Sequence, residues 1–552
     1  MADEANLLVF RETKSQVPTK RLVQELSGKV AAGLESRDAV VDALIRAGEL
    51  ECALFDTNAE GANIVAALSD HLAALLVTPS SGNISGIQDV ISRIQCIELP
   101  ETVPTSPPEG FAYYALHPAD FVDSAIRLPR ASQVVVIGIR SIGTTLSAVV
   151  TAALKTQGHV ATRTTVRPTG HPYDRQTQFS HEQQQTIRAN NERLAHFLVV
   201  DEGPGLSGSS FLSVGEALMT YGITSDRITL MGTREPDPSQ LYASNGHDRW
   251  NRFSHITICP RFYGRTVQGA SLSGGAWRKL FLGSEDAWPA CWPEMERLKC
   301  LSPDGMSVLK FDGLGRFGQQ VRDRADCICR AGLGAAVEDA GDGLSAYRFI
   351  GGRPLTRSDL SVSVIERIAR YCAVRAIEFR TSRSAQAGIA EMVRHNLRQE
   401  LNLSWAPDPD VFASSACIVA DGRMQPEEWI GTPKGEMLKV DAGTHGDDHF
   451  FPGAIDIAWD LAGAIVEWDL SQDAEQLLVA EYERLAGDDP RDRLHAFVIA
   501  YTVFSLAYCK MAQLAGQDSA EALRWQRAYK FYSRRVNKEL GRVKYLPQSM
   551  GI

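Results

Sequence analysis

Residues 197–210 read Phe-Leu-Val-Val-Asp-Glu-Gly-Pro-Gly-Leu-Ser-Gly-Ser-Ser. The four apolar residues predict a buried strand of a parallel sheet, and two adjacent acids, Asp201 and Glu202, follow it directly. A loop of small residues then leads into a helix-like apolar pattern that begins at Phe211. The backbone N–H groups of residues 206–210 and the start of that helix suit a phosphate, while the carboxylates suit sugar hydroxyls. The stretch therefore predicts an α/β fold with a site for a phosphorylated sugar.

A second strand–loop–helix pattern lies about sixty residues earlier. The apolar run 134–139 is followed by a turn-prone segment made of Arg140, Ser141, Ile142 and Gly143. Backbone amides of this loop, together with the Arg140 guanidinium, suit a pyrophosphate group. One glycine turn is weak evidence, but two phosphate-type loops in this order and spacing are strong evidence.

The two loops together resemble the type I phosphoribosyltransferases, whose signature has apolar residues, two acids and a final Thr/Ser-Gly-x-Thr/Ser. Ser207-Gly208-Ser209-Ser210 fills that end, although the loop is about one residue longer than usual and Glu202 stands where Asp is commoner. The resemblance implies a site for phosphoribosyl diphosphate (PRPP). In that site the catalytic residues are Asp201, Glu202 and Arg140, and the loops holding the phosphate and pyrophosphate groups are Ser141, Ile142, Gly143, Gly205, Leu206, Ser207, Gly208, Ser209 and Ser210. An ordinary strand–turn–helix of a doubly wound sheet is the alternative.

Residues 165–175 lie between the two loops and are rich in Pro, Gly and charge, which predicts an exposed loop. The resemblance places the mobile catalytic loop of the transferases here, and its closure would exclude water from the reacting ribosyl centre. Arg167, His171 and Arg175 are the candidates for holding the pyrophosphate. A solvated surface loop is the alternative interpretation.

Composition limits the function classes. The chain has 552 residues, which is enough for several domains, and its net charge of −10 argues against a general nucleic-acid binder. The ten cysteines are scattered without Cys-x-x-Cys spacing, so sulfur ligation of a metal is not expected. The start of the chain lacks the blocks of a signal peptide, and no apolar run approaches the ~18–20 residues of a membrane span. We therefore expect a cytoplasmic protein with small-molecule partners, no nucleic acid and no membrane.

The chain divides into three parts by pattern. Residues 1–78 predict a helical segment, either an N-terminal cap or a dimerisation element that would give a homodimer. Residues 79–264 predict the α/β, parallel-sheet domain of the phosphoribosyltransferase type, and residues 265–552 predict a different, α+β domain.

The third part carries a lysine and two acids at the ends of apolar runs. Lys310 lies in the strand-like stretch 307–311, Asp421 follows the apolar run 416–420, and Asp441 ends another strand-like stretch twenty residues later. The spacing Gly313-x-Gly315-x-x-Gly318 matches a dinucleotide or kinase glycine loop, but a lone match of this kind is weak.

These residues, with a distal Asp460-Leu-Ala, resemble the aminoglycoside-phosphotransferase and choline-kinase branch of the protein-kinase-like fold. The resemblance implies that Asp421 orients or deprotonates an acceptor hydroxyl, Asp441 holds Mg²⁺ on the ATP phosphates, and Lys310 pairs with the α- and β-phosphates. Asp460 would brace the catalytic loop. Two departures stand out: Ala420 replaces the usual His, and Pro426 replaces the usual Asn, which leaves Glu428 or its neighbour Glu427 as the second metal ligand.

The leading hypothesis is a bifunctional enzyme. One site would transfer the phosphoribosyl group of PRPP to a base-like nucleophile, or run that reaction in reverse, and the other would move a phosphoryl group from ATP to a hydroxyl. Covalent fusion suggests that the two act in sequence on a nucleoside-like compound. The rival hypothesis is a sensor that binds PRPP or a nucleotide and carries an inactive kinase-like domain. A third interpretation treats residues 265–552 as a helical substrate-recognition domain.

Overall fold

The structure is a computed structural model. It describes residues 7–11, 14–79, 84–125, 133–205, 207–258, 269–381, 388–413, 416–444, 446, 448–515 and 519–544. Leu206, which was predicted to contact a phosphate, and the predicted boundary at 264/265 lie outside these residues.

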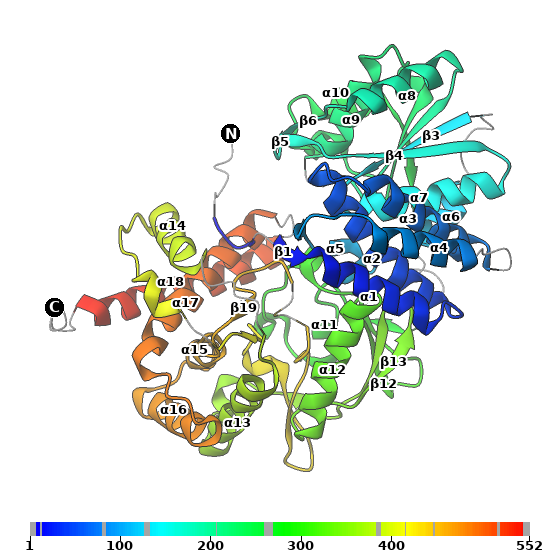
Figure 1. Cartoon of the computed structure of the whole chain (residues 1–552). Coiled ribbons are helices and arrows are strands. Elements are labelled where there is room, and N and C mark those ends of the chain that lie inside the picture. Colours follow the sequence, from blue (N-terminus) through cyan, green and yellow to red (C-terminus); the bar gives the residue numbers. More distant parts are fainter. Residues whose placement is uncertain are drawn as a thin grey trace.

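The first half is built on a five-stranded, fully parallel sheet, which confirms the α/β prediction in its general form (Figure 1). Its strands, in the spatial order β4-β3-β7-β8-β9, are β4 (Val160–Val166), β3 (Gln133–Ile139), β7 (His196–Val200), β8 (Ile228–Gly232) and β9 (Ser254–Thr257). The chain leaves β3 toward β4 on one side and then continues with β7 on the other. The strand order therefore reverses between β3 and β7, and this is the switch point where doubly wound sheets bind ligands.

Both faces of this sheet are covered, which explains why its strands read as continuous apolar runs. Val134, Val136, Leu198 and Val200 belong to the core on one face, and Val135, Ile137, Phe197 and Val199 to the core on the other. The helices of the sheet domain are α6 (Asp120–Ala125), α7 (Ile142–Thr156), α8 (His181–Glu192), α9 (Ser209–Met219) and α10 (Gly246–Trp250).

Helices at the start of the chain form a layer between the parallel sheet and the second half (Figure 1). They are α1 (Thr19–Ala32), α2 (Arg37–Asp56), α3 (Ala62–Val77) and α4 (Ile84–Cys96), so this layer extends beyond residue 78. Helices α2 and α3 pack on α7. The buried guanidinium of Arg163 on β4 fixes them in place through ion pairs with Glu51 and Asp70. Two short strands, β1 (Ser15–Pro18) and β2 (Thr102–Thr105), pair beside α2.

The second half starts with a five-stranded antiparallel sheet in the order β10-β11-β12-β14-β13. The strands are β10 (Ala270–Ser271), β11 (Lys299–Leu301), β12 (Ser307–Phe311), β13 (Val337–Gly341) and β14 (Leu344–Arg348), and α12 (Arg316–Arg330) connects β12 to β13. A short helix, α11 (Trp277–Phe281), precedes β11.

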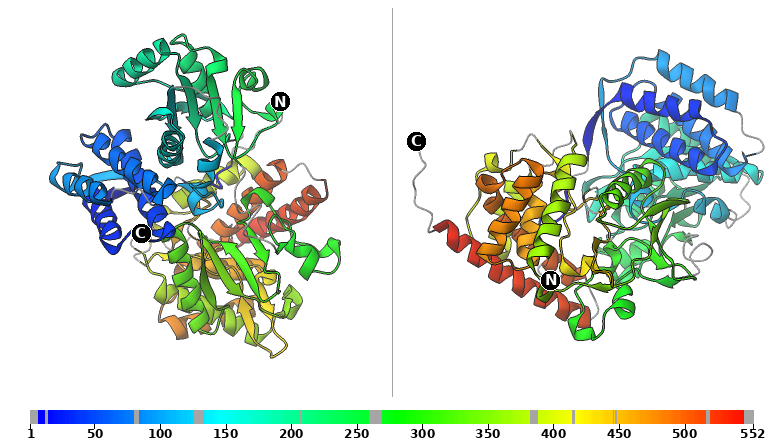
Figure 2. Two further views of the ribbon diagram at one scale, coloured as in Figure 1. Left: turned by 90° about the vertical axis from the view of Figure 1, so that its right-hand side faces the viewer. Right: turned by 90° about the horizontal axis from the view of Figure 1, so that it is seen from below.

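The rest of the second half is mainly helical, with short strand pairs (Figure 2). The helices are α13 (Val362–Glu378), α14 (Ile389–Leu401), α15 (Ala458–Glu467), α16 (Gln472–Ala486), α17 (Arg491–Ala515) and α18 (Ser519–Lys544); the strands are β15 (Arg353–Pro354), β16 (Ile418–Val419), β17 (Trp429–Gly431), β18 (Met437–Lys439) and β19 (Ala454–Ile455). Among the described helices, α17 alone is long and apolar enough to cross a membrane, and 67% of its apolar window is buried inside the protein.

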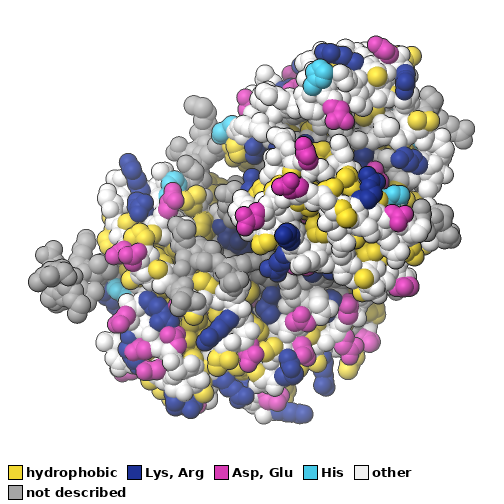
Figure 3. All heavy atoms as spheres, in the orientation of Figure 1, with side chains coloured by type: hydrophobic (Ala, Val, Ile, Leu, Met, Phe, Trp, Pro, Cys, Tyr) yellow, Lys and Arg dark blue, Asp and Glu magenta, His cyan; other side chains and the backbone are white. Residues whose placement is uncertain are grey.

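One apolar core runs across the predicted division between the halves. It contains residues of α1–α4, one face of the parallel sheet, and Phe311, Leu314 and Leu344 of the second half. The short helix α5 (Glu109–Ala112) joins the halves, because the Leu314 N–H donates to the Phe111 carbonyl over 2.9 Å. On the face drawn in Figure 3, basic and acidic side chains are interspersed.

Candidate functional sites

The two predicted phosphate loops lie side by side at the switch point. Strands β3 and β7 are direct neighbours in the sheet, so the loops that leave their carboxyl ends start next to each other. Gly143 lies in the first turn of α7 and allows a close approach, since a Cβ there would lie 2.6 Å from the Val200 carbonyl oxygen. Ile142 and Gly143 are buried in the first turn of α7, and Ser141 precedes them at its N-cap.

Asp201 and Glu202 leave β7 at this point with half-buried side chains. The Glu202 N–H donates to the Asp201 carboxylate over 2.9 Å, and the Glu202 carboxylate accepts from the Gly110 N–H of α5. Burial raises the pKa of Asp201 to about 7. Burial, with the nearby charges of Asp201 and Glu109, raises the pKa of Glu202 to about 8. Near neutral pH the two carboxyl groups can therefore both donate and accept hydrogen bonds.

The loop after the acids turns into α9 through Gly208, whose φ of 64° lies in the left-handed region. The hydroxyls of Ser207 and Ser209 both donate to the Pro172 carbonyl, over 2.8 and 2.6 Å. A Cβ on Gly205 would meet no atom within 4 Å, so open space adjoins the loop there. Ser210 lies in the first turn of α9 and is half-buried.

The predicted mobile loop forms a small hairpin of β5 (Thr169–His171) and β6 (Asp174–Gln176). Its tip is exposed, as predicted, whereas Thr165 and Val166 are buried in β4. The hairpin holds its own polar side chains: Arg175 donates to the Gly170 carbonyl over 2.7 Å, and His171 accepts from the Tyr173 N–H over 3.2 Å.

Arg140 and Arg167 come together, but both are paired with Asp56 at the end of α2. Arg140 Nη1 lies 3.0 Å from Asp56 Oδ1, and Arg167 Nη2 lies 2.6 Å from Asp56 Oδ2. Asp56 could not be predicted from the sequence, because it carries no motif and precedes Arg140 by 84 positions.

In the second half, Lys310 and Asp441, which were predicted to hold the ATP phosphates and Mg²⁺, form an ion pair with each other. Lys310 Nζ lies 2.8 Å from Asp441 Oδ1 and also donates to the Thr444 hydroxyl over 3.0 Å. A second lysine, Lys299 on β11, lies 3.6 Å from Asp441 Oδ2. Burial lowers the pKa of Lys299, but the charges of Asp441 and other nearby acids outweigh burial and raise it to about 12. The Asp441 side chain is 26% exposed, so it is open to a ligand.

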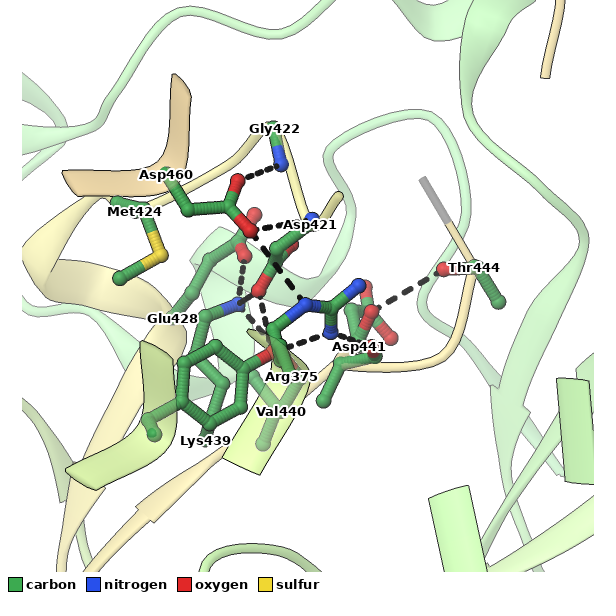
Figure 4. Close-up of polar contacts among 12 residues, drawn as sticks. Arg375, Asp421, Gly422, Met424, Glu428, Lys439, Val440, Asp441, Thr444 and Asp460 are labelled. Carbon is green, nitrogen blue, oxygen red and sulfur yellow. Dashed lines mark hydrogen bonds and ion pairs between the residues drawn. The ribbon is translucent and has the colours of Figure 1, made fainter. Parts of the chain in front are cut away.

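Asp421, the predicted base, is enclosed instead (Figure 4). Its side chain has no exposed area, and its Oδ2 lies 3.1 Å from Lys439 Nζ and 2.6 Å from the Tyr371 hydroxyl. Asp460 braces this loop as predicted, because its carboxylate accepts from the N–H groups of Asp421 and Gly422 over 2.9 and 2.8 Å. In this arrangement the Asp421 carboxylate is not exposed to an acceptor hydroxyl, and its role as a base stays a prediction.

Glu428 shares the lysine that holds Asp421. Its Oε2 lies 2.6 Å from Lys439 Nζ, and its side chain is 18% exposed. Burial raises the pKa of Glu428 to about 7 although Lys439 lowers it. Arg423 lies in the same acidic surroundings, near Glu428 and Asp448. The motif that was used for this half, an acid at the end of an apolar strand, does not predict a role for Lys439 or Arg423.

Comparisons with known proteins found similarity only among solved structures: no family model and no curated protein matched. The choline kinase LicA from Streptococcus pneumoniae matches at 16% identity over 44% of this chain and 90% of its own, with a TM-score of 0.31. An ethanolamine kinase from Plasmodium vivax matches at 11% identity over 46% and 79%, with a TM-score of 0.30. An aminoglycoside phosphotransferase from Alicyclobacillus acidocaldarius matches at 10% identity over 45% and 91%, with a TM-score of 0.29. All three TM-scores lie below 0.5.

Proposed function

We propose that the protein is a PRPP-dependent phosphoribosyltransferase whose second half binds Mg²⁺ and ATP as a kinase-like domain. One observation carries the first part: both phosphate-type loops and the acid pair meet at the switch point of a parallel sheet. Ligands of doubly wound sheets bind outside the carboxyl ends of the strands at this point. The acid pair then faces the sugar, and the loop amides face its phosphate groups.

The chemistry of the first site would be mainly electrostatic. Asp201 and Glu202 would hold the ribose hydroxyls while positive charge develops at the anomeric carbon, and the start of α9 would hold the 5′-phosphate. The guanidiniums of Arg140 and Arg167 would stabilise the diphosphate as it leaves. The hairpin of β5 and β6, tied to the serines of the loop through Pro172, would limit the access of water.

The second site offers a donor set that suits Mg²⁺ on a nucleotide. Mg²⁺ is usually held by one or two carboxylates together with phosphate oxygens, and Asp441 supplies an accessible carboxylate. Glu428 is the candidate for the second ligand. Lys310 and Lys299 would balance the phosphate charge, and the metal would neutralise charge on the transferred phosphoryl group.

A second candidate function is sensing without phosphoryl transfer. The enclosure of Asp421 by Lys439 and Tyr371 favours it, because no acceptor can be deprotonated by a carboxylate with no exposed area. In this case the second half would bind a nucleotide and report its presence, while the first half would still bind PRPP.

The first part is tested by the release of diphosphate from PRPP in the presence of a panel of nucleobases. We expect a base-dependent release that is lost in the double variant Asp201→Asn, Glu202→Gln, together with PRPP binding that weakens at least tenfold in calorimetry. Glu192→Gln, which changes an exposed acid at the end of α8, is the control variant. Equal PRPP affinity of the wild type and the double variant would refute the proposal.

The second part is tested with a non-hydrolysable ATP analogue. We expect Mg²⁺-dependent binding that Asp441→Ala abolishes and that Asp304→Asn, an exposed acid on the turn between β11 and β12, leaves intact. ATP hydrolysis or phosphoryl transfer lost in Asp441→Ala would support a kinase, whereas binding without turnover would support the sensor. An absence of analogue binding would leave the helical substrate-recognition interpretation.

A further inference from the structure

One carboxylate already occupies both cationic side chains that the proposed function assigns to diphosphate. Arg167 contacts Asp56 twice, through Nη2 at 2.6 Å and Nε at 3.2 Å, and Arg140 Nη1 contacts the same carboxylate at 3.0 Å. Two guanidiniums on one carboxylate form the arrangement in which proteins bind phosphate oxygens. The Asp56 carboxylate therefore occupies the position on the two guanidiniums where a phosphate group of a ligand would bind.

A cavity of about 280 Å³ opens beside this cluster. It lies between α2, β2 and the loop after β3, and its polar lining includes Lys14, Glu49, Asp56, Ser141, Thr145 and Arg167. The cavity joins the first phosphate-type loop to the Asp56 pair, so an anion held at Ser141 would adjoin both the carboxylate and the Arg167 guanidinium.

The position of Asp56 is explained by the arginines rather than by its own helix. Asp56 is the last residue of α2, where a negative charge opposes the helix dipole. Burial opposes its ionisation, but hydrogen bonds and charge from Arg167 and Arg140 outweigh burial and lower its pKa. The carboxylate is thus ionised at neutral pH, and its side chain is 21% exposed, so it has a path into water.

Contacts that do not involve Asp56 also hold Arg140. Its Nε donates to the Thr165 hydroxyl over 3.2 Å and its Nη2 to the Thr165 carbonyl over 3.0 Å. Arg167 is likewise fixed by donating from Nη1 to the Arg140 carbonyl over 2.8 Å. The two cations are therefore held by contacts that do not involve the carboxylate.

We propose that Asp56 is an internal competitor for diphosphate: it occupies Arg140 and Arg167 until the diphosphate group of the ligand displaces it. The identity of the ligand as PRPP rests on the proposed function, whereas the competition rests on the ion pairs and the cavity alone. The consequence is a site that discriminates against weaker, singly charged anions, because a ligand has to replace a carboxylate on two guanidiniums.

The test uses the full-length protein and inorganic diphosphate in isothermal titration calorimetry. We expect Asp56→Asn, and independently Asp56→Ser, to bind diphosphate at least tenfold more tightly than the wild type. Glu60→Gln removes the same charge from the segment after α2 and forms no ion pair with either arginine in the described residues, so its affinity stays at the wild-type value. In an Arg167→Gln background the gain from Asp56→Asn shrinks, because one of the two cations is gone.

The outcomes separate this inference from the proposed function. The inference is overturned if both Asp56 variants bind diphosphate with the same affinity as the wild type or more weakly. This holds even if PRPP binding depends on Asp201. A different result supports the inference and refutes the proposed transferase site. In that result the Asp56 variants gain affinity for diphosphate, while Asp201→Asn leaves the affinity for PRPP unchanged.

Discussion

Replacing Glu202 by Gln should stabilise the protein, and more so as the pH rises. The pKa of Glu202 rises from its ordinary 4.5 to about 8 on folding, because the side chain is buried beside Asp201 and Glu109. The unfolded chain therefore loses this proton at a lower pH than the folded chain, so folding stability is lost as the pH increases from about 4.5 to 8. Each pKa unit is worth about 1.4 kcal/mol, which sets an upper bound of about 5 kcal/mol.

The expected gain is smaller than this bound, about 2 kcal/mol at pH 8, because water reaches the half-buried side chain and screens its charge. Well below pH 4.5, both states hold the proton and the variant should match the wild type. Urea unfolding at about pH 3, 6 and 8 measures the difference, and Glu192→Gln, which changes an exposed acid at the end of α8, is the control. A Glu202→Gln variant that is less stable than the wild type at pH 8 would refute the reasoning.

Three further variants probe the same structure. Lys439→Met should lower the free energy of unfolding by about 3–5 kcal/mol in urea, because it removes the buried lysine that lies 3.1 Å from the enclosed Asp421 carboxylate; a loss below 1 kcal/mol would contradict the buried pair. Gly110→Ala should weaken PRPP at least tenfold in calorimetry, since its Cβ would lie 2.8 Å from Glu202 Cδ, while ATP-analogue affinity stays unchanged. Lys310→Met should weaken the ATP analogue at least tenfold without changing PRPP affinity, and equal analogue affinity would exclude Lys310 from the site.

The parallel sheet could be predicted from the sequence because its strands are buried on both faces. The apolar runs 134–139 and 197–200 correspond to β3 and β7 within one residue at each end. The loops at their carboxyl ends follow from the same pattern, since parallel neighbours end at one edge of the sheet. Asp56 could not be predicted in this way, because a helical acid reaches Arg140 only through the packing of α2 on α7.

The second half was harder to predict because an acid at the end of a strand has several uses. Asp421 and Asp441 look alike in sequence, yet one is enclosed by Lys439 and Tyr371 and the other is open beside Lys310. The difference arises from side chains on β18 and α13, which carry no motif of their own. The strand that carries Lys310 was predicted correctly at 307–311, since Val308 and Phe311 are residue types that favour strands.

The apolar core that crosses from α1–α4 into β12 and β14 has a consequence for the energetics of the whole chain. A cut near residue 265 would open this core to water, so neither fragment would keep the stability that it has in the full-length protein. The intact chain should then melt in a single step. A small molecule that binds to one half of the chain would then raise the melting temperature that a fluorophore on the other half reports.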